Sequence, residues 1–419
     1  VIYDVNHHLK KSFLNQNIVN FKKQWFYWDY LSNINKEPDI EYLKSFEKKY
    51  EIDLWKIGFS ERIFSDFQKF HNFTRKEILS ILEHDCKFFE NVLDEVNPNF
   101  LIIKLADFHR TQLLVELCKA KGVKVLMLIS SRLGFHSYIS SSISKTENFM
   151  DSKTNKKSIT FSELQEYLKK FDKFKQYSKI QSGGIGVPTK DKIKTFLNWS
   201  FQTYDNEYRK TYDHFGVTRF RVLKNKINEE LIRSSRQRFL EKNSIKNPTF
   251  KEKFIYFPLQ TQPERNIDID APYYSDQLVV IENISRSLPI QYKLYVKEHN
   301  SMKFRNWRPK SFYNSILNLP NVELFHPSLN PFEFIKNCSL VITIAGSAGL
   351  EAAFFEKPSI VLADISYSNL SCVKKIKNIE ELPNAINESL KIKVDPYELR
   401  NFVLHQEKNS FEFDVVDMA

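Results

Sequence analysis

The chain has 419 residues, of which 42% are hydrophobic, and a formal net charge of +11. This length predicts two or three domains of ordinary size, and the apolar content excludes global disorder. The four cysteines form no C-x-x-C pair, which excludes a zinc ribbon and a disulfide framework and fits a reducing cytoplasm. The first residues lack the apolar stretch of a signal peptide, and no run of 18 apolar residues occurs, so we expect neither a signal peptide nor a transmembrane helix.

The first half of the chain predicts one clear β-α-β unit. In chain order we expect a helix, a strand, a helix and a strand at 75–96, 99–107, 109–122 and 123–130. Residues 140–180 are polar and rich in Lys and Ser, which predicts an exposed insertion. A loop at 182–188 then leads into long basic helices over 190–243.

The last third alternates regularly between strands and helices. We expect strands at 253–259, 292–298, 322–326, 339–345 and 358–363. Helices are expected at 275–288, 309–319, 330–338, 347–356, 379–391 and 395–406. Continuous apolar strands in strict alternation with helices predict a parallel sheet that is covered on both faces.

The fold class is therefore α/β, with two Rossmann-like domains. We expect an N-terminal domain over 1–185 with helical and polar insertions, a basic helical connecting region over 186–250, and a C-terminal domain over 251–419. Two such domains leave a central cleft between them, and ligands bind beyond the carboxyl ends of the strands. The loops of interest thus follow residues 107, 130, 259, 298 and 345.

The stretch "VITIAGSAGLEAAFFEKPSIVLA" (341–363) places a serine between glycines where a buried strand meets a helix. A helix N-terminus exposes free N–H groups, Gly346 and Gly349 allow close approach to the backbone, and Ser347 offers a hydroxyl to a phosphate oxygen. Glu351 lies one turn further and suits a ribose hydroxyl. The alternative is that the glycines only ease helix–strand packing and that Ser347 only caps the helix.

The stretch "YVKEHN" (295–300) ends a neighbouring strand. Lys297 and His299 alternate with apolar positions and should point to one face, where a cation and an imidazole would clamp a phosphate or diphosphate. Arg305 and Arg308 follow in "RNWRP". A lone Lys or His at such a position is usually solvent-facing, which is the alternative here.

The stretch "FPLQTQPERN" (257–266) is the first loop of the C-terminal domain. Gln260, Gln262 and Glu264 offer polar contacts, and Pro263 stiffens the turn. The loop is not a Walker loop, and no G-x-G-x-x-G occurs in the chain. ATP hydrolysis and dinucleotide redox chemistry therefore lose most of their support.

Two loops of the first domain carry candidate groups. In "KLADFHRT" (104–111), Asp107 or His109 is a candidate general base for an acceptor hydroxyl, while an ordinary helix cap by Asp107 is the alternative. In "SSRLGFHS" (130–137), Arg132 and His136 are candidate contacts for an anion.

In order, "FIYFPLQTQPE", "LYVKEH", "R-x-x-x-FY", "PNVELFHP" and "ITIAGSAGLEAAFFEKPSIV" resemble the capsule polysaccharide biosynthesis family. Its members are GT-B glycosyltransferase-like proteins and include capsular Kdo transferases. The similarity covers about 250–363 well, and "LIIKLADFHR…VKVLMLISSRLG" resembles the N-terminal half more weakly. The resemblance implies the GT-B architecture.

The resemblance implies donor-binding roles for several residues. Lys297 and His299 match the family's Lys-x-His-Pro motif, and Ser347 matches its phosphate-binding Ser/Thr motif. Arg308 and Tyr313 match its arginine and tyrosine, and Glu351 matches the glutamate of Gly-x-x-Gly-x-Glu-Ala. Asn300 stands where the family usually has proline, a departure that leaves the donor open. The expected donor site thus comprises Gln260, Glu264, Lys297, His299, Arg308, Tyr313, Gly346, Ser347 and Glu351.

We expect a glycosyltransferase that moves a sugar from a nucleotide donor, CMP-linked sugars among the candidates, to a growing capsule or lipopolysaccharide. It should need no cofactor and no metal, because no D-x-D stands at a strand end; "DID" (268–270) lies in a loop. The alternatives are a glycerophosphotransferase of the teichoic-acid type, a non-catalytic glycan-binding protein and, with less support, a sugar-nucleotide epimerase.

The positive charge is concentrated in the first part of the chain. Residues 1–250 carry a net +13 and residues 251–419 a net −2. This asymmetry indicates an anionic partner, whether a membrane surface, a phosphorylated acceptor or nucleic acid, although a solvated Lys-rich surface explains it too. With the family resemblance, we expect a lipid-linked acceptor, no nucleic acid, and peripheral binding to the cytoplasmic face of the membrane.

Overall fold

The computed structural model describes residues 1–5, 10, 13–16, 18–31, 37–67, 69–133, 136–143, 160–170 and 211–413. The chain forms two compact units, one of residues 1–125 and 183–225 and the other of residues 126–182 and 226–419. The predicted domain boundaries at 185 and 250 stay a prediction. The predicted loop at 182–188 and most of the predicted insertion at 140–180 lie outside the described residues.

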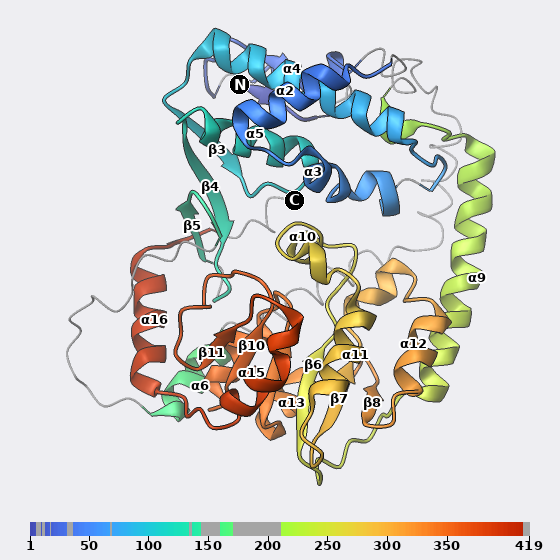
Figure 1. Cartoon of the computed structure of the whole chain (residues 1–419), viewed down its shortest axis with the longest axis vertical. Helices are drawn as coiled ribbons and strands as arrows, with labels where there is room; N and C mark the ends of the chain where they lie inside the picture. The colour runs from blue at the N-terminus through green and yellow to red at the C-terminus, as the bar shows by residue number, and fades with distance from the viewer. Residues whose placement is uncertain are drawn as a thin grey trace. The chain divides into compact units, whose positions relative to one another are not determined.

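The second unit contains a parallel sheet of six strands with the order β11-β10-β9-β6-β7-β8 (Figure 1). Its strands are β6 (Phe254–Pro258), β7 (Lys293–Lys297), β8 (Val322–Phe325), β9 (Leu340–Thr343), β10 (Ser359–Val361) and β11 (Val373–Lys375). Read from β8, successive strands lie in the doubly wound order 3-2-1-4-5-6, which reverses between β6 and β9. The crevice beyond the carboxyl ends of those two strands is where this fold binds ligands.

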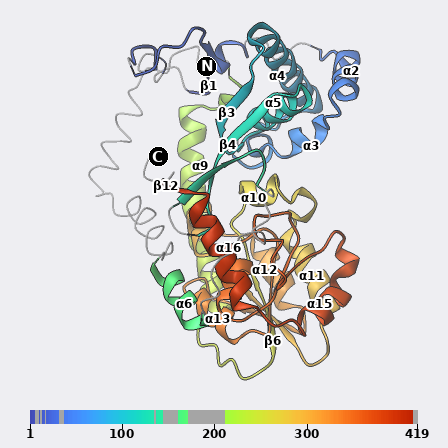
Figure 2. The same cartoon turned by 90° about the vertical axis from the view of Figure 1, so that its left-hand side faces the viewer.

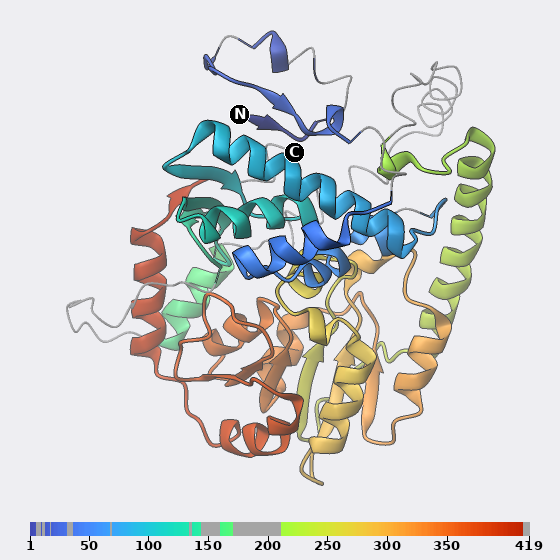
Figure 3. The same cartoon turned by 45° about the horizontal axis from the view of Figure 1, so that its top comes forward.

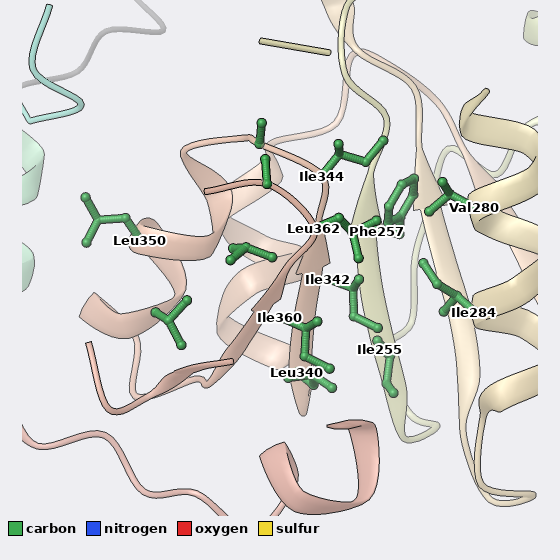
Figure 4. Packing of buried hydrophobic residues seen from close by; sticks show 14 of the residues in the cluster. Ile255, Phe257, Val280, Ile284, Leu340, Ile342, Ile344, Leu350, Ile360 and Leu362 are labelled. Carbon is green, nitrogen blue, oxygen red and sulfur yellow. The ribbon is translucent and has the colours of Figure 1, made fainter. Parts of the chain in front are cut away.

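Helices cover both faces of this sheet. They are α11 (Gln277–Ser287), α12 (Lys310–Leu317), α13 (Pro331–Asn337), α14 (Ala348–Phe354), α15 (Leu382–Ser389) and α16 (Pro396–Lys408). Alternate residues of β6 point to opposite faces, so Ile255 and Phe257 pack toward Val280 and Ile284 of α11 (Figure 4). On the other face Tyr256 stacks on Phe334 of α13, with ring centroids 5.1 Å apart. The predicted parallel sheet, buried on both faces, is confirmed.

Further elements surround this sheet. The short helix α10 (Arg265–Asp268) follows the loop after β6, and α6 (Phe161–Lys170) lies beside α16 (Figure 2). The 25-residue helix α9 (Arg219–Asn243) runs from one unit into the other. It lies within the predicted basic helical region, which the structure describes from residue 211 onward.

The first unit is mainly helical among its described residues. Its helices and paired strands are α2 (Ile40–Tyr50), α3 (Leu54–Phe59), α4 (Arg75–Val96), α5 (His109–Ala120), β1 (Ile2–Tyr3), β2 (Trp25–Phe26) and β3 (Phe100–Lys104). Helix α4 packs against α2, α3 and α5 (Figure 3). It begins at a capping box in which Thr74 and Glu77 bond each other's backbone N–H groups.

A four-stranded sheet has the order β12-β5-β4-β3. The division between the units falls within β4 (Lys124–Ser130). The predicted helix–strand–helix–strand succession at 75–130 is confirmed as α4, β3, α5 and β4. Two strands that the sequence did not indicate, β5 (His136–Ser140) and β12 (Phe411–Glu412), join the sheet in antiparallel fashion.

Candidate functional site

The loops after β6 and β9 meet at the point where the strand order reverses. The Gln260 amide lies 2.9 Å from the Thr343 hydroxyl. When the side-chain oxygen of Gln260 faces the loop after β9, it also accepts a hydrogen bond from the Ala345 N–H at 3.1 Å. Within that loop, the Gly346 N–H donates to the Thr343 hydroxyl oxygen at 3.1 Å. Residues 83 positions apart in sequence thus fix the shape of the segment that follows β9, residues 344–349, which we call the serine loop.

The two glycines of the serine loop make room for protein side chains. A Cβ atom on Gly346 would lie 2.6 Å from the Gln260 amide nitrogen and 2.7 Å from the Thr343 hydroxyl. A Cβ atom on Gly349 would lie 2.6 Å from the Tyr367 hydroxyl. Packing therefore explains both glycines. The close approach of a ligand to the backbone of Gly346 and Gly349 stays a prediction.

Ser347 immediately precedes α14 and is half-buried, but its side chain makes no capping hydrogen bond. The alternative in which Ser347 serves only as a helix cap is therefore wrong. Its carbonyl accepts from the N–H of Leu350 and of Glu351, so its backbone is used by the helix while its hydroxyl is not.

Lys297 is a buried cation at the end of β7, only 6% exposed. Its Nζ donates to the carbonyls of Pro327 at 3.0 Å and Glu298 at 3.3 Å. Within the described ranges no carboxylate forms an ion pair with it. Desolvation lowers the pKa of Lys297 to about 8, against the opposing charge of Glu298. Because Lys297 is buried, the alternative of a solvent-facing lysine is wrong. An ammonium ion held in the interior is ready to bind an anion.

His299 presents a neutral ring. Its Nδ1 lies 2.9 Å from the Thr261 hydroxyl and accepts from the Ser301 N–H at 3.2 Å, so the ring proton belongs on Nε2. Desolvation, and after it the charge of Lys297, lowers the pKa of His299. The residue as a whole is exposed although its ring is partly buried, and in the described part of the chain nothing is bonded to Nε2. At neutral pH His299 therefore offers a hydrogen-bond donor and no charge.

Glu298 lies between these two residues and is completely buried, a role that the sequence did not indicate. One of its oxygens accepts from the His299 N–H at 2.6 Å. The other accepts from Arg308 Nε at 2.9 Å and from the Tyr313 hydroxyl at 2.8 Å. A carboxylate directly after a buried strand was the available signal, because strand alternation turns it away from Lys297 and His299.

Arg308 and Tyr313, both predicted to bind the donor, are brought to this cluster but lie in its interior. Arg308 is 6% exposed, and Tyr313 is fully buried. Besides Glu298, Arg308 donates to the Gln260 carbonyl and, at 3.4 Å, to the Gln262 side chain. In this arrangement both residues hold the loops in place.

The loop after β6 has a second support that the sequence did not indicate. The side-chain amide of Gln277, which is 1% exposed, accepts from the Gln260 N–H at 2.8 Å and donates to the Gln260 carbonyl at 3.0 Å. Its place at the start of an apolar helix was the only signal for it. The predicted donor contact Glu264 lies in the same loop, at the N-cap position of α10, where its side chain forms no capping bond.

Arg132 reaches the serine loop from the segment after β4. Its guanidinium carbon lies 5.9 Å from the centre of the Tyr367 ring, and the Tyr367 hydroxyl donates to the Gly346 carbonyl. Glu351 is half-buried one turn into α14 and close enough to Tyr367 to help raise the pKa of that phenol, which burial raises most. The structure thus gathers Arg132, Gly346 and Glu351 around one tyrosine.

The model of one protein family, described as capsule polysaccharide biosynthesis protein, matches residues 154–372. That is more than half of the chain. The chain belongs to the capsule polysaccharide biosynthesis family. Its fold is α/β, with a doubly wound parallel sheet in the second unit. No curated protein matches the chain.

Among solved structures, the chain is similar to KpsC of Thermosulfurimonas dismutans, a beta Kdo 2,7 transferase, with 14% identity over 84% of this chain and 87% of that one and a TM-score of 0.34. It is also similar to UDP-GlcNAc 2-epimerase from Methanocaldococcus jannaschii, with 13% identity over 85% and 84% of the two chains and a TM-score of 0.28. For Anabaena Alr3699/HepE in complex with UDP-glucose the identity is 15%, the coverage 45% and 50%, and the TM-score 0.26. At these scores the likenesses carry no argument about the site.

In this member of the family the two predicted base candidates of the first unit differ sharply. Asp107 is accessible, with 37% of its side chain exposed, and accepts from Arg62 at 2.7 Å. His109 is fully buried between two carboxylates, with Nδ1 against Glu61 and Nε2 2.8 Å from Asp85. Burial disfavours the imidazolium, but Glu61 and Asp85 outweigh burial and raise the pKa of His109 to about 9.

This environment argues against the predicted role of His109 as a base, because the ring is completely buried between two carboxylates and is already protonated at neutral pH. Among the described residues of this capsule-family chain, no group of three or more His, Cys, Asp or Glu side chains is arranged to hold a metal ion. No helix in the described ranges has both the length and the apolarity to cross a membrane.

Proposed function

We propose that this protein transfers a sugar from a nucleotide donor to a growing surface polysaccharide of the capsule or lipopolysaccharide type. Membership of the capsule polysaccharide biosynthesis family supports this proposal. The observation that carries it is the position of three polar side chains beyond the carboxyl ends of the sheet, around the reversal of the strand order: Lys297 at the end of β7, His299 just after it and Ser347 after β9.

The donor contacts follow from the groups that the fold leaves unused. The Lys297 ammonium has three N–H groups, and two of them donate to backbone carbonyls. The third, with the Nε2–H of His299 and the hydroxyl of Ser347, would bind the donor's phosphate oxygens. Glu351 is assigned to a ribose hydroxyl because a carboxylate repels phosphate. Gln260, Glu264, Arg308, Tyr313 and Gly346 shape and support the loops around the donor.

The reaction breaks the bond between the anomeric carbon and the phosphate oxygen, and a new bond joins that carbon to an acceptor oxygen. The acceptor hydroxyl loses its proton to a base, for which Asp107 is our candidate, and the nucleotide leaves with the bonding electrons. Lys297 stabilises the negative charge that develops on the leaving phosphate. We propose that neither a metal nor a cofactor takes part, and that the acceptor is lipid-linked and met at the cytoplasmic face of the membrane.

A panel of nucleotides tests this function. Thermal unfolding is followed with CMP, UDP, GDP and CDP, and the nucleotide that stabilises the protein selects the sugar nucleotides for a transfer assay with and without a chelator. We expect one nucleotide to raise the unfolding temperature, and its sugar donor to be consumed only when a glycan acceptor is present. Consumption of CDP-glycerol would instead identify a glycerophosphotransferase, and no donor consumption at all would leave a glycan-binding protein.

A further inference from the structure

Helix α9 carries a row of exposed apolar side chains that nothing in the site explains. Phe220 is 74% exposed, Leu223 39%, Ile227 57% and Leu231 66%. Their spacing of three, four and four residues places them on one face over three turns of the helix. We call these four residues the α9 stripe. An apolar row of this kind on a water-facing helix marks a surface that is covered in use.

The opposite face of α9 is the one that packs against the protein. Arg236 donates to the Trp307 carbonyl at 2.8 Å, and Leu240 is buried in the core of the second unit. Phe239 stacks near Tyr313, with ring centroids 6.3 Å apart, so this end of α9 lies beside α12 (Figure 1). The helix is therefore anchored through its second half, and the α9 stripe is not its core-facing side.

The charges on α9 identify the chemistry of what covers the stripe. The helix has eight basic and three acidic residues. Lys224 and Lys226, both exposed, border the stripe, and Glu230 is the one acidic side chain next to it. An apolar row bordered by lysines is typical of a helix that lies in the plane of an anionic lipid surface.

A second copy of the chain fits these observations less well. The face of the stripe continues into Ser234 and Arg238, so the apolar pattern stops after three turns, and a coiled coil needs three to four heptads. Two copies of the same basic helix would also repel each other.

We propose that α9 binds the surface of an anionic membrane, with the α9 stripe between the lipid headgroups and the bordering lysines against their phosphates. This proposal rests on the proposed function, in which the protein meets its lipid-linked acceptor at a membrane. Binding through α9 leaves the donor site free, because the stripe contains no residue of that site.

Sedimentation with lipid vesicles tests the proposal. The full chain is mixed with vesicles of phosphatidylglycerol and phosphatidylcholine, or of phosphatidylcholine alone, at about 0.1 M and about 1 M salt. We expect binding to the anionic vesicles at low salt only, since the Debye length falls from about 10 Å to about 3 Å. Ile227→Ser with Leu231→Ser should weaken that binding about tenfold or more, because each loses a lipid-buried aliphatic side chain.

A matched control is the pair Val279→Ser and Ile290→Ser, which removes apolar side chains that are 50% and 101% exposed elsewhere in the second unit and should leave vesicle binding unchanged. Thermal unfolding and nucleotide binding are measured on every variant. The proposal is overturned if the parent protein ignores anionic vesicles, if both pairs bind equally, or if sedimentation velocity shows a dimer that only the stripe variants dissociate. Normal vesicle binding without any nucleotide binding would instead count against the proposed function alone.

Discussion

Glu298 and Arg308 form a completely internal ion pair, with Arg308 Nε 2.9 Å from the carboxylate. Because Arg308 also reaches the Gln260 carbonyl, this pair joins the loops after β6 and β7. Replacing Arg308 by Met should lower the free energy of unfolding by about 3–5 kcal/mol, since it leaves a buried charge without a partner. Urea unfolding followed by tryptophan fluorescence measures the change.

The double variant is the control for this pair. Adding Glu298→Gln to Arg308→Met removes the uncompensated charge, so part of the lost stability should return. If the two losses simply add, the pair is not coupled in the way the geometry indicates.

Gly346→Ala should destabilise the second unit by about 1–3 kcal/mol, because the new Cβ atom meets Gln260 and Thr343 at less than 3 Å. The loop must shift to accept it, so nucleotide affinity should fall as well. Gly58→Ala is the matched control: its Cβ atom would lie 3.3 Å from the end of the Leu82 side chain, which has to shift by only a few tenths of an ångström, and α3 gains from the alanine. Equal unfolding temperatures for the parent and Gly346→Ala would show that the loop has room to spare.

The phosphate contacts predict a loss of binding without a loss of folding. Ser347→Ala and His299→Ala should each weaken nucleotide affinity about tenfold or more, since a hydrogen bond to a charged phosphate contributes roughly 1.5–3 kcal/mol. Isothermal titration calorimetry measures the affinity. Ser347→Thr keeps the hydroxyl and should retain most of the binding; unchanged affinity in both alanine variants would remove the phosphate contacts from the site.

A feature of the fold can be predicted from the sequence when the residues that determine it are close together in the chain. The strands around Ile255 and Ile342 were predictable because a continuous apolar run needs no partner to be recognised. The start of α11 was predictable from its helical spacing, and in the structure Asp276 caps it. Strand β11 was missed because a short edge strand with two lysines has no such signature.

The candidate site was predictable in its position but only partly in its chemistry. Strand ends locate Lys297, His299 and Ser347, since the fold class fixes where ligands bind. The buried roles of Glu298 and Gln277 depend on partners that lie 10–17 residues away, and Gln260 meets Thr343 across 83 residues. The burial of His109 could not be predicted for the same reason, because its partner Glu61 lies 48 residues earlier.

Lys297 should give donor binding a characteristic dependence on pH. Its pKa of about 8 lies below the ordinary value of 10.5, so the ammonium ion is lost as pH rises through 8, and nucleotide affinity should fall there. The unfolded chain binds more protons than the folded one between pH 8 and 10.5, so this group makes the folded state more stable as pH rises across the same range. Affinity measured from pH 6.5 to 9.5 tests the first effect.

Lys297→Met serves as the reference for that titration. It should bind nucleotide weakly at every pH and lose the step near pH 8. A step of the same size in Lys297→Met would assign the titration to another group.

In the first unit His109 is a buried histidine and Asp107 is an accessible carboxylate. Substitutions at these two residues should therefore have different effects. Asp107→Asn should lower turnover about 10²–10⁴-fold with donor affinity unchanged, as expected for a general base. It should also lower the free energy of unfolding, because it removes the carboxylate that pairs with the buried Arg62. His109→Gln should instead lower the free energy of unfolding by about 3–5 kcal/mol, because Glu61 and Asp85 lose the cation between them. The stability from His109 is fully present below its unfolded pKa of 6.5 and is lost as pH rises through about 9, so the parent and His109→Gln should converge in stability at alkaline pH. Normal turnover in Asp107→Asn would exclude it as the base, and a stability difference that persists unchanged above pH 9 would show that the His109 imidazolium is not what holds the two carboxylates together.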